Sequence, residues 1–389
     1  MILEPMVAAA RSRGASDLHI EPGLPPMIRL EGRLEPAGAP IDRAGVAEIA
    51  RELLDESEWR QLEQRRSFDL SRTIGGVRCR VNVLHSIRGI GLAVRLLASV
   101  QPTLEKLNVH PDLGRFAESA HGLVLVSGAT GSGKSSTLAA LIHQINVTEA
   151  CHVVTIEEPV EYVFEPREAF IRQRQVGQDT PSFEQALIDV LREDPDVVMV
   201  GEMRHPEVMR LTLGVAETGH LTFATVHSSN TADALQRVVA SFPAEIQSGV
   251  MAQLADCLLA VVCQRLIYHP EAQQRIPEIE VLIGTAAVRN LIRQGQFFKL
   301  PSVLATGARD GMWTFERYRQ WIDSRPSFYR FEDPKNSAGI EAPEVIRPAP
   351  DRAPEDRQRP EVAEPAKVFT IEPEEEDFSK LLSQLRPSS

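Results

Sequence analysis

Cysteine, positive charge and long apolar runs are all scarce in this sequence. The 389 residues include four cysteines, none in a CxxC pair, which argues against a disulfide framework or a zinc ribbon. No stretch approaches the roughly 18 apolar residues of a membrane-spanning helix, and the first residues, MILEPMVAAARSRG, are unlike a signal peptide. Lysine and arginine number 42 against 54 acids, and the net charge of −12 argues against a broad nucleic-acid surface. We therefore expect a cytoplasmic globular protein that binds no nucleic acid.

Composition and hydrophobic spacing divide the chain into three regions, the first two of which predict folded domains. Residues 1–105 contain alternating segments typical of hairpins, such as MIRLEGRLEPAG and VRCRVNVLHSIRGIGLAVRLL, and the helical spacing of VAEIARELLDESEWRQLEQ. Residues 106–332 alternate apolar strands (GLVLVS, HVVTIE, DVVMVG, LTFATVH) with helices, and after Phe242 helical spacing dominates apart from PEIEVLIG. We expect an α/β protein in which a small α+β domain precedes a sheet covered by helices on both faces.

The third region is a C-terminal tail, residues 333–389. It holds nine of the chain's 27 prolines and thirteen acids, with few large apolar residues. Such a segment cannot bury enough surface to offset its ordering entropy, so we expect disorder. Within the tail, Phe378, Leu381, Leu382 and Leu385 follow an acidic run at helical spacing. They indicate either a short helix that folds onto a partner or an accidental apolar cluster.

A phosphate-binding motif lies at the start of the second region. Residues Gly128 to Ser135 spell GATGSGKS, a complete GxxxxGK[ST], between the strand LVLVS and the helical run SSTLAALIHQI. Glycines let backbone N–H groups wrap a phosphate, Lys134 reaches the β- and γ-phosphates, and the Ser135 hydroxyl can hold Mg²⁺. The predicted nucleotide-binding residues are Gly128, Thr130, Gly131, Ser132, Gly133, Lys134, Ser135 and Ser136.

Acidic and imidazole side chains follow three further strands of the same region. HVVTIE ends at Glu157, with Glu158 next to it, DVVMVGE ends at Glu202, and LTFATVH ends at His227. Open α/β sheets bind ligands at this edge, so we assign these groups to metal coordination, water activation and phosphate sensing. Gly201 stands where a magnesium-binding aspartate is usual. We therefore expect Glu157, acting through water, to help the motif's last serine hold the metal.

Four segments occur in a fixed order: GATGSGKSS, TIEEPVEY, LREDPDVVMVGEMR and AETGHLTFATVH. They resemble the Walker A, Asp box, Walker B and His box of the secretion and type IV pilus ATPases. GASDLHIEPGLPPMIRLEG resembles the start of the retraction ATPases, and AVRNLIRQ and GMWTF are similar to AIRNLIRE and GMQTF of PilT-type motors. The resemblance covers about residues 1–325. It identifies the chain as similar to the type IV pilus retraction ATPases of the PilT and PilU type.

The resemblance implies a fold and an assembly. The first domain is expected to be PAS-like and the second a RecA-like P-loop ATPase that uses ATP and Mg²⁺. The family's members imply a homohexamer that drives pilus retraction and twitching motility. They also imply a place at the cytoplasmic side of the inner membrane, with a pilus platform protein as partner and a paralogous retraction ATPase as a further one.

Arginines of the first domain complete the expected catalytic set. Arg80, Arg88 and Arg95 lie in the segment that matches the family's strands with sensor arginines. Such an arginine, brought to a neighbouring γ-phosphate, stabilises transition-state charge. We assign Arg88 and Arg95 to catalysis and expect Arg78 on a solvated strand face. His220 in GHL is either the family's first His-box residue or a histidine that caps the preceding helix.

Departures from the family pattern leave its subtype open. The Asp box reads TIEEP in place of TIEDP, which keeps a carboxylate at Glu158, and His205 replaces an aspartate usual in retraction motors. ATVHSSN and the acidic tail resemble the PilU-type paralogue. The leading function is an ATP-driven retraction motor, and the alternative is an accessory PilU-like subunit with little turnover of its own. The missing four-cysteine zinc module disfavours an assembly or secretion motor, and the acidic charge disfavours a nucleic-acid translocase.

Overall fold

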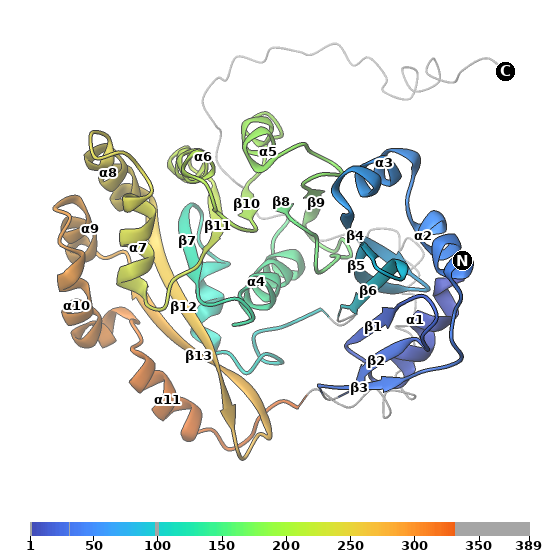
Figure 1. Cartoon of the computed structure of the whole chain (residues 1–389). Coiled ribbons are helices and arrows are strands. Elements are labelled where there is room, and N and C mark those ends of the chain that lie inside the picture. The colour runs from blue at the N-terminus through green and yellow to red at the C-terminus, as the bar shows by residue number, and fades with distance from the viewer. Residues whose placement is uncertain (1, 31, 98–100, 331–389) are drawn as a thin grey trace, which may run out of the picture. The chain divides into compact units, whose positions relative to one another are not determined.

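The computed structural model describes residues 2–30, 32–97 and 101–330, which form two separate β-sheets with their helices (Figure 1). The predicted tail, 333–389, with its apolar cluster at Phe378 to Leu385, lies outside the described residues. The four cysteines, Cys79, Cys151, Cys257 and Cys263, are free. In the part of the chain that is described, no helix is both long and apolar enough to cross a membrane.

The first sheet is antiparallel and has the strand order β3-β2-β1-β6-β5-β4. Three helices pack on one face of it and close a single hydrophobic cluster. The other face carries polar side chains, because buried and less buried residues alternate along β5. The elements are α1 (Leu3–Ser12), β1 (Asp17–Ile20), β2 (Met27–Leu30), β3 (Arg33–Pro36), α2 (Arg43–Leu53), α3 (Glu56–Arg65), β4 (Ser67–Ile74), β5 (Val77–Ser86) and β6 (Gly89–Leu96).

The helical segment predicted in this region is broken in two. The helical spacing of VAEIARELLDESEWRQLEQ is confirmed, and the run forms two helices: α2 ends at Leu53 and α3 begins at Glu56. Asp55 between them accepts hydrogen bonds from the backbone N–H groups of Ser57 and Glu58, and the Glu58 side chain accepts one from the Asp55 N–H. This reciprocal capping box starts a new helix, and it is the reason for the break.

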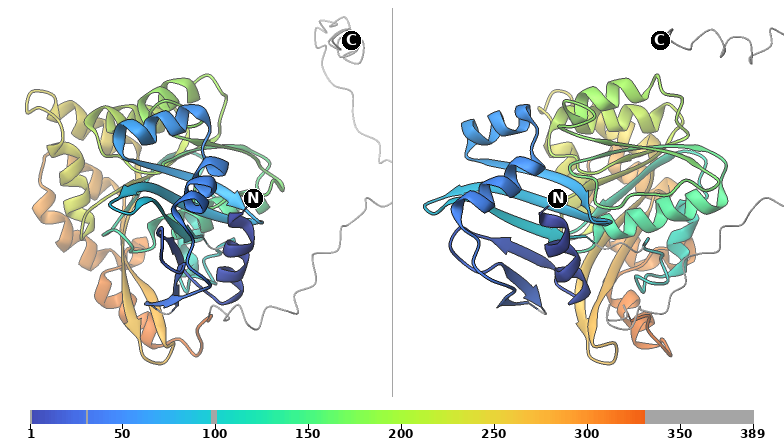
Figure 2. Two further views of the ribbon diagram at one scale, coloured as in Figure 1. Left: turned by 45° about the vertical axis from the view of Figure 1, so that its right-hand side comes forward. Right: turned by 90° about the vertical axis from the view of Figure 1, so that its right-hand side faces the viewer.

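The second sheet has the order β13-β12-β7-β11-β10-β8-β9, and all its strands except the edge strand β13 run parallel (Figures 1 and 2). Both faces are covered, as predicted, and the α/β class is confirmed. Its strands are β7 (Gly122–Ser127), β8 (His152–Glu157), β9 (Phe170–Gln175), β10 (Val197–Val200), β11 (Leu221–Val226), β12 (Leu258–His269) and β13 (Gln274–Ile283).

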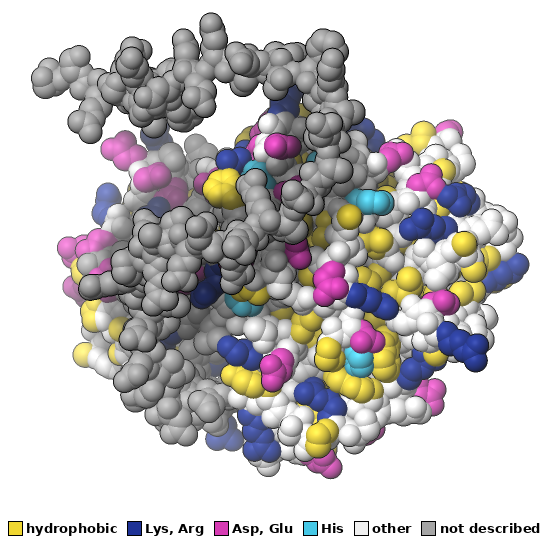
Figure 3. Space-filling view, turned by 180° about the vertical axis from the view of Figure 1, so that it is seen from behind, with side chains coloured by type: hydrophobic (Ala, Val, Ile, Leu, Met, Phe, Trp, Pro, Cys, Tyr) yellow, Lys and Arg dark blue, Asp and Glu magenta, His cyan; other side chains and the backbone are white. Residues whose placement is uncertain are grey.

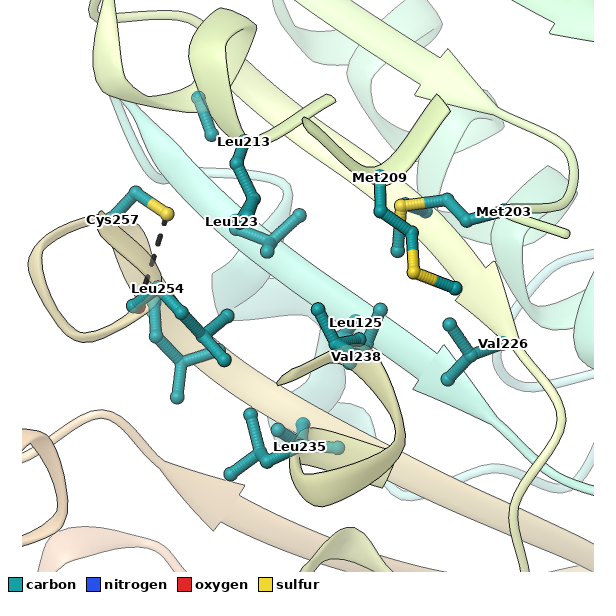
Figure 4. Packing of buried hydrophobic residues seen from close by; sticks show 14 of the residues in the cluster. Leu123, Leu125, Met203, Met209, Leu213, Val226, Leu235, Val238, Leu254 and Cys257 are labelled. Carbon is teal, nitrogen blue, oxygen red and sulfur yellow. Dashed lines mark hydrogen bonds between the residues drawn. The ribbon is translucent and has the colours of Figure 1, made fainter. Parts of the chain in front are cut away.

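Two hydrophobic clusters cover this sheet, one on each face. Helices α5 to α10 contribute to one cluster, and α4 and α11 to the other. Figure 4 shows the first, in which Met209 and Leu213 of α6 and Leu235 of α7 surround Leu123 and Leu125 of β7. The helices are α4 (Lys134–Thr148), α5 (Phe183–Val190), α6 (Pro206–Glu217), α7 (Thr231–Ala240), α8 (Gln247–Cys257), α9 (Ala286–Arg293), α10 (Leu300–Thr306) and α11 (Phe315–Asp323), with short 3₁₀ turns at Pro111–Phe116, Phe297–Lys299 and Gly307–Asp310.

One strand of this sheet contradicts the sequence-based expectation. Helical spacing was predicted to dominate after Phe242, but α8 ends at Cys257 and the next twelve residues form β12. The run LLAVVCQRLIYH is almost continuously apolar at its start, and such a run fits a buried strand as well as a buried helix. β12 lies between β7 and β13, so it is an inner strand next to the phosphate loop.

Candidate active site

The phosphate loop joins the end of β7 to the start of α4, as its motif predicts. Gly131 and Gly133 have φ angles of 76° and 88°, a left-handed conformation that glycine adopts without strain. Lys134 is the first residue of α4, and its Nζ donates hydrogen bonds to the carbonyl oxygens of Gly128 and Ala129, at 2.9 and 3.1 Å. Burial lowers the pKa of Lys134, and nearby Glu202 counteracts this. The lysine side chain therefore contacts the backbone of the phosphate loop in this structure.

A polar cavity of about 600 Å³ opens beside this loop. Its wall includes the predicted loop residues Thr130, Gly131, Gly133, Lys134, Ser135 and Ser136. The strand-end groups Glu157, Glu158, Glu202 and His227 line it as well. The structure thus brings together, at one edge of the parallel sheet, groups that come from four separate segments of sequence.

The side chains of two predicted loop residues, Ser132 and Ser136, lie in different surroundings. The Ser132 side chain is 5% exposed, and its buried Oγ has no hydrogen-bond partner within the described residues, so only its backbone is placed to meet a phosphate. The Ser136 hydroxyl lies 2.8 Å from the hydroxyl of Tyr162, which also lines the cavity. Ser135 has an exposed side chain and is free to meet a ligand.

Glu202 is held on both of its carboxylate oxygens. His227 Nε2 lies 2.7 Å from Oε1, and Arg204 Nη2 lies 2.8 Å from Oε2. Burial raises the pKa of Glu202, but the hydrogen bonds and charges of Arg204 and His227 outweigh it and hold this pKa below its usual value. The group is therefore a carboxylate with two partners, directed into the cavity of the phosphate loop.

Arg204 is a site residue that the sequence analysis did not single out. Besides its contact with Glu202, its Nη1 lies 3.5 Å from Oε2 of Glu158, so one guanidinium bridges the acids that follow β8 and β10. The signal was present in the GEMR of the third family segment. Arg204 stands two residues after Glu202, and its contact with Glu158 across the strands is visible only in the fold.

Glu157 is the most enclosed acid of the site. Its side chain accepts hydrogen bonds at Oε1 from Thr155 Oγ1, at 2.7 Å, and from Gln173 Nε2, at 3.1 Å. Burial raises the pKa of Glu157 despite these bonds. A Cβ at Gly201 would lie 3.2 Å from the Ile156 carbonyl oxygen and 3.4 Å from the Glu157 Cα, so a larger residue there would press on β8. The tight packing explains why a glycine, Gly201, follows directly after β10.

No group of three or more histidine, cysteine or acidic side chains able to hold a metal ion occurs in residues 2–30, 32–97 and 101–330. The exposed Ser135 hydroxyl and the buried Glu157 carboxyl both line the cavity, which fits an ion held mainly by phosphate and water oxygens.

The arginines of the first sheet lie in three different environments. Arg80 and Arg95 line the cavity, and Arg95 Nε also pairs with Asp17 at 3.0 Å. Arg88 is exposed at the tip of the β5–β6 hairpin and does not line the cavity of its own chain. Arg78, expected on a solvated face, is half-buried, and its guanidinium donates to Val160 O and Gln175 Oε1. That expectation was wrong, because the polar face of the first sheet has a neighbour.

His220 lies outside this arrangement. Its Nδ1 is 3.0 Å from the carbonyl oxygen of Val215, in the last turn of α6, and 3.0 Å from the hydroxyl of Thr218, the residue after that helix. Of the two interpretations left open, this geometry is that of a histidine at a helix end. The catalytic, nucleotide-binding and metal-binding roles assigned above stay predictions. The geometry shows where the side chains lie.

Comparisons with known proteins agree with this arrangement. A family model described as "Type II/IV secretion system protein" matches residues 1–292. The chain is 40% identical over 318 residues to the type IV pilus retraction ATPase PilT of Pseudomonas aeruginosa, which covers 81% of this chain and 92% of that protein. It is 35% identical over 319 residues to the type IV pilus ATPase PilU of the same organism, over 82% of this chain and 84% of that one.

A solved structure is similar over nearly the same span. The crystal structure of the pilus retraction motor PilT with bound ADP has a TM-score of 0.73 to this chain at 35% identity, and the match covers 84% of this chain and 97% of that one. In the present chain, the phosphate loop, the strand-end acids and two arginines of the first sheet lie around one cavity, as expected for the four sequence segments. The chain belongs to the type II/IV secretion system protein family and, within it, to the ATPases of type IV pilus retraction.

Proposed function

We propose that this protein hydrolyses Mg·ATP and works as a homohexameric ring that retracts type IV pili and so drives twitching motility. The observation that carries the proposal is the single cavity in which the phosphate loop, the Glu202–His227–Arg204 cluster and Arg95 of the first sheet meet. A loop of this kind binds the phosphates, and a strand-end carboxylate beside it can activate water.

Each group has a defined task in this reaction. The loop's N–H groups and Lys134 hold the phosphates, and Lys134 would exchange the carbonyl oxygens of Gly128 and Ala129 for phosphate oxygens. The Ser135 hydroxyl and, through water, Glu157 would hold Mg²⁺, whose charge offsets that of the phosphates. Glu202 accepts the proton of the attacking water at one carboxylate oxygen, and its contact with His227 keeps the carboxylate aimed at the cavity.

The placement of the arginines supports the ring. Arg80 and Arg95 line the cavity of their own chain, whereas Arg88 at the hairpin tip does not line it and is suited to a neighbouring copy. A mixed-ring experiment tests this sharing. Doping active chains with Lys134→Ala chains should lower ATPase activity by more than their fraction, and strictly proportional loss would contradict a shared site.

The relatives favour retraction: PilT of Pseudomonas aeruginosa is a type IV pilus retraction ATPase, and PilU of the same organism is a type IV pilus ATPase. We place the ring in the cytoplasm at the inner membrane, against a pilus platform protein. Deleting the gene should leave cells that carry more pili and cannot twitch, and restoring it with Glu202→Gln should not rescue motility. A bald mutant would instead indicate pilus assembly.

An accessory PilU-like role is the alternative, and turnover separates the two. The complete phosphate loop and the paired Glu202 favour independent hydrolysis. Purified protein that hydrolyses ATP alone, and that supports twitching in cells without a paralogous retraction ATPase, would establish the motor. Hydrolysis or motility that depends on the paralogue would establish the accessory subunit.

A further inference from the structure

The strand β12, which the sequence pattern did not predict, supplies a buried side chain to the phosphate loop. Gln264 of β12 is 1% exposed. Its Nε2 donates a hydrogen bond of 2.7 Å to the carbonyl oxygen of Ser132, in the middle of the loop. Its Oε1 accepts a hydrogen bond of 2.7 Å from Thr137 Oγ1, in the first turn of α4. One amide thus ties the loop to the helix that follows it.

The same residue explains two glycines of the motif. A Cβ at Gly128 would lie 2.3 Å from the Gln264 carbonyl oxygen, and a Cβ at Gly133 would lie 2.7 Å from Gln264 Nε2. Both distances are shorter than any real contact of a Cβ. The backbone of β12 therefore leaves no room for a side chain at Gly128, and a side chain at Gly133 would displace the Gln264 amide; each glycine also has a positive φ angle.

Gln264 does not itself line the cavity, so it acts on a ligand only through the loop. The Gln264 amide binds the Ser132 carbonyl oxygen and so fixes the orientation of that peptide group. In this orientation the neighbouring N–H groups can turn toward a phosphate. Lys134 also braces the loop while its Nζ contacts two loop carbonyl oxygens, but a bound phosphate would draw it away. When the phosphate is bound, Gln264 would still hold the loop through its hydrogen bond to the Ser132 carbonyl oxygen.

β12 is a firm support for this contact. On the next residue, Arg265, Nε lies 2.7 Å from Oε2 of the fully buried Glu278, and Arg319 of α11 binds the same carboxylate. The residue after that, Leu266, lines the cavity. The strand is thus fixed to β13 and α11 on one side and borders the phosphate loop on the other.

We propose that Gln264 is a positioning residue that holds the phosphate loop in the shape that accepts the β-phosphate of a nucleotide. The proposal rests on the proposed function in taking ATP and ADP as ligands. The loop's amides are useful only when they point together at the phosphate, and a buried amide that loses its partners makes that shape costly. Gln264 should therefore set nucleotide affinity without touching the nucleotide.

The test compares two variants that remove the bonds from opposite ends. Gln264→Met keeps the length of the side chain and removes both hydrogen bonds, and Thr137→Val removes the one to Oε1. We expect each to weaken the binding of a fluorescent ADP, with a loss of roughly tenfold for Gln264→Met. The double variant should be no weaker than Gln264→Met alone, because both act through one contact. The KM for ATP should rise more than kcat falls.

Two controls separate positioning from general loss of structure. Thr222→Val makes the same chemical change at another fully buried threonine, on β11, and should leave ADP affinity unchanged. Binding of AMP, which lacks the β-phosphate, should change little in any variant. Folded Gln264→Met and Thr137→Val proteins with parental ADP affinity would overturn the proposal, as would equal losses for ADP and AMP. Should Gln264→Met fail to fold, Thr137→Val decides alone. A parent protein that binds no ADP would refute the proposed function instead.

Discussion

The two sheets of this protein present their polar groups in different ways. Along β5 of the first sheet, buried Val81 and Val83 alternate with Arg80 and Asn82, so the polar groups stand in mid-strand on the face that carries no helices. Along β11 of the second sheet every residue is buried, and the polar groups that line the cavity, Thr225 and His227, lie at or just past the strand's carboxyl end. The first sheet offers a face and the second an edge.

The difference follows from how the sheets are covered. Helices pack on one face of the antiparallel sheet and on both faces of the parallel one. In the parallel sheet polar side chains reach the cavity at or next to the carboxyl ends of the strands, as Glu157, Thr225 and His227 do. Substitutions in this protein should therefore divide: strand ends of the parallel sheet control chemistry, its strand centres control stability, and the polar face of the first sheet affects chemistry at the two arginines that line the cavity, Arg80 and Arg95.

The largest effect should come from the strand-end groups. Lys134→Ala removes the grip on the phosphates, and Glu202→Gln removes the base while keeping the shape. Each should lower the rate of ATP hydrolysis by about two to four decades. Glu202→Gln should still bind a fluorescent nucleotide analogue, whereas Lys134→Ala should bind it weakly. Hydrolysis at the parental rate in Glu202→Gln would remove that residue from the role of base.

A strand centre of the parallel sheet should come next. Phe223 of β11 is fully buried, and Phe223→Ala should lower the free energy of unfolding by about 3–5 kcal/mol. Asn82 on the polar face of β5 is the position for comparison, and its Nδ2 donates hydrogen bonds to Ser67 Oγ and Asp69 Oδ1. Asn82→Ala should cost about 1 kcal/mol or less in denaturant unfolding. Equal costs at the two positions would break the contrast between the sheets.

The same contrast explains which parts the sequence could predict. Glycines with positive φ, continuous apolar strands and polar residues after them are local signals, so the phosphate loop and the positions of Glu157, Glu202 and His227 were readable. Contacts between segments left no such signal. The inner strand β12 looked helical, and Arg78 looked solvated because its partner Val160 lies far along the chain.

Side-chain direction was the other gap. The motif fixed where Ser132 stands in the sequence, but its hydroxyl is turned under the loop, beside the strand that supplies Gln264. Arg204 was visible in GEMR, yet its bridge between Glu158 and Glu202 depends on the parallel pairing of β8 with β10. A sequence pattern predicts where a residue lies along its element, but the residue that it contacts depends on how the elements pack together.

The strand-end carboxylate should also show its partners in a pH profile. The Arg204 hydrogen bond and charge lower the pKa of Glu202, which keeps this carboxylate ionised to lower pH. Arg204→Gln removes that stabilisation, so Glu202 should take up a proton at higher pH and the acidic limb of the kcat profile should move upward. Arg204→Lys, which keeps the charge, should move it less. Arg210→Gln is the matched control, since Arg210 pairs with Glu207 on α6 outside the cavity. An unmoved limb in Arg204→Gln would show that Glu202 is not the group titrating there.

The smallest effect in vitro should come from the outer side of a covering helix. In α9, which carries the AVRNLIRQ signature, Ile292 is fully buried and Asn290 is exposed. Ile292→Ala should lower stability by about 2–5 kcal/mol and ATPase activity with it. Asn290→Ala should change stability by less than about 0.5 kcal/mol. If the signature serves contact with a partner and not packing, Asn290→Ala should still reduce twitching while ATPase activity and melting temperature stay parental. Normal twitching in that variant would mean that the signature residues serve to pack the hydrophobic core and that the exposed face of α9 has no part in coupling.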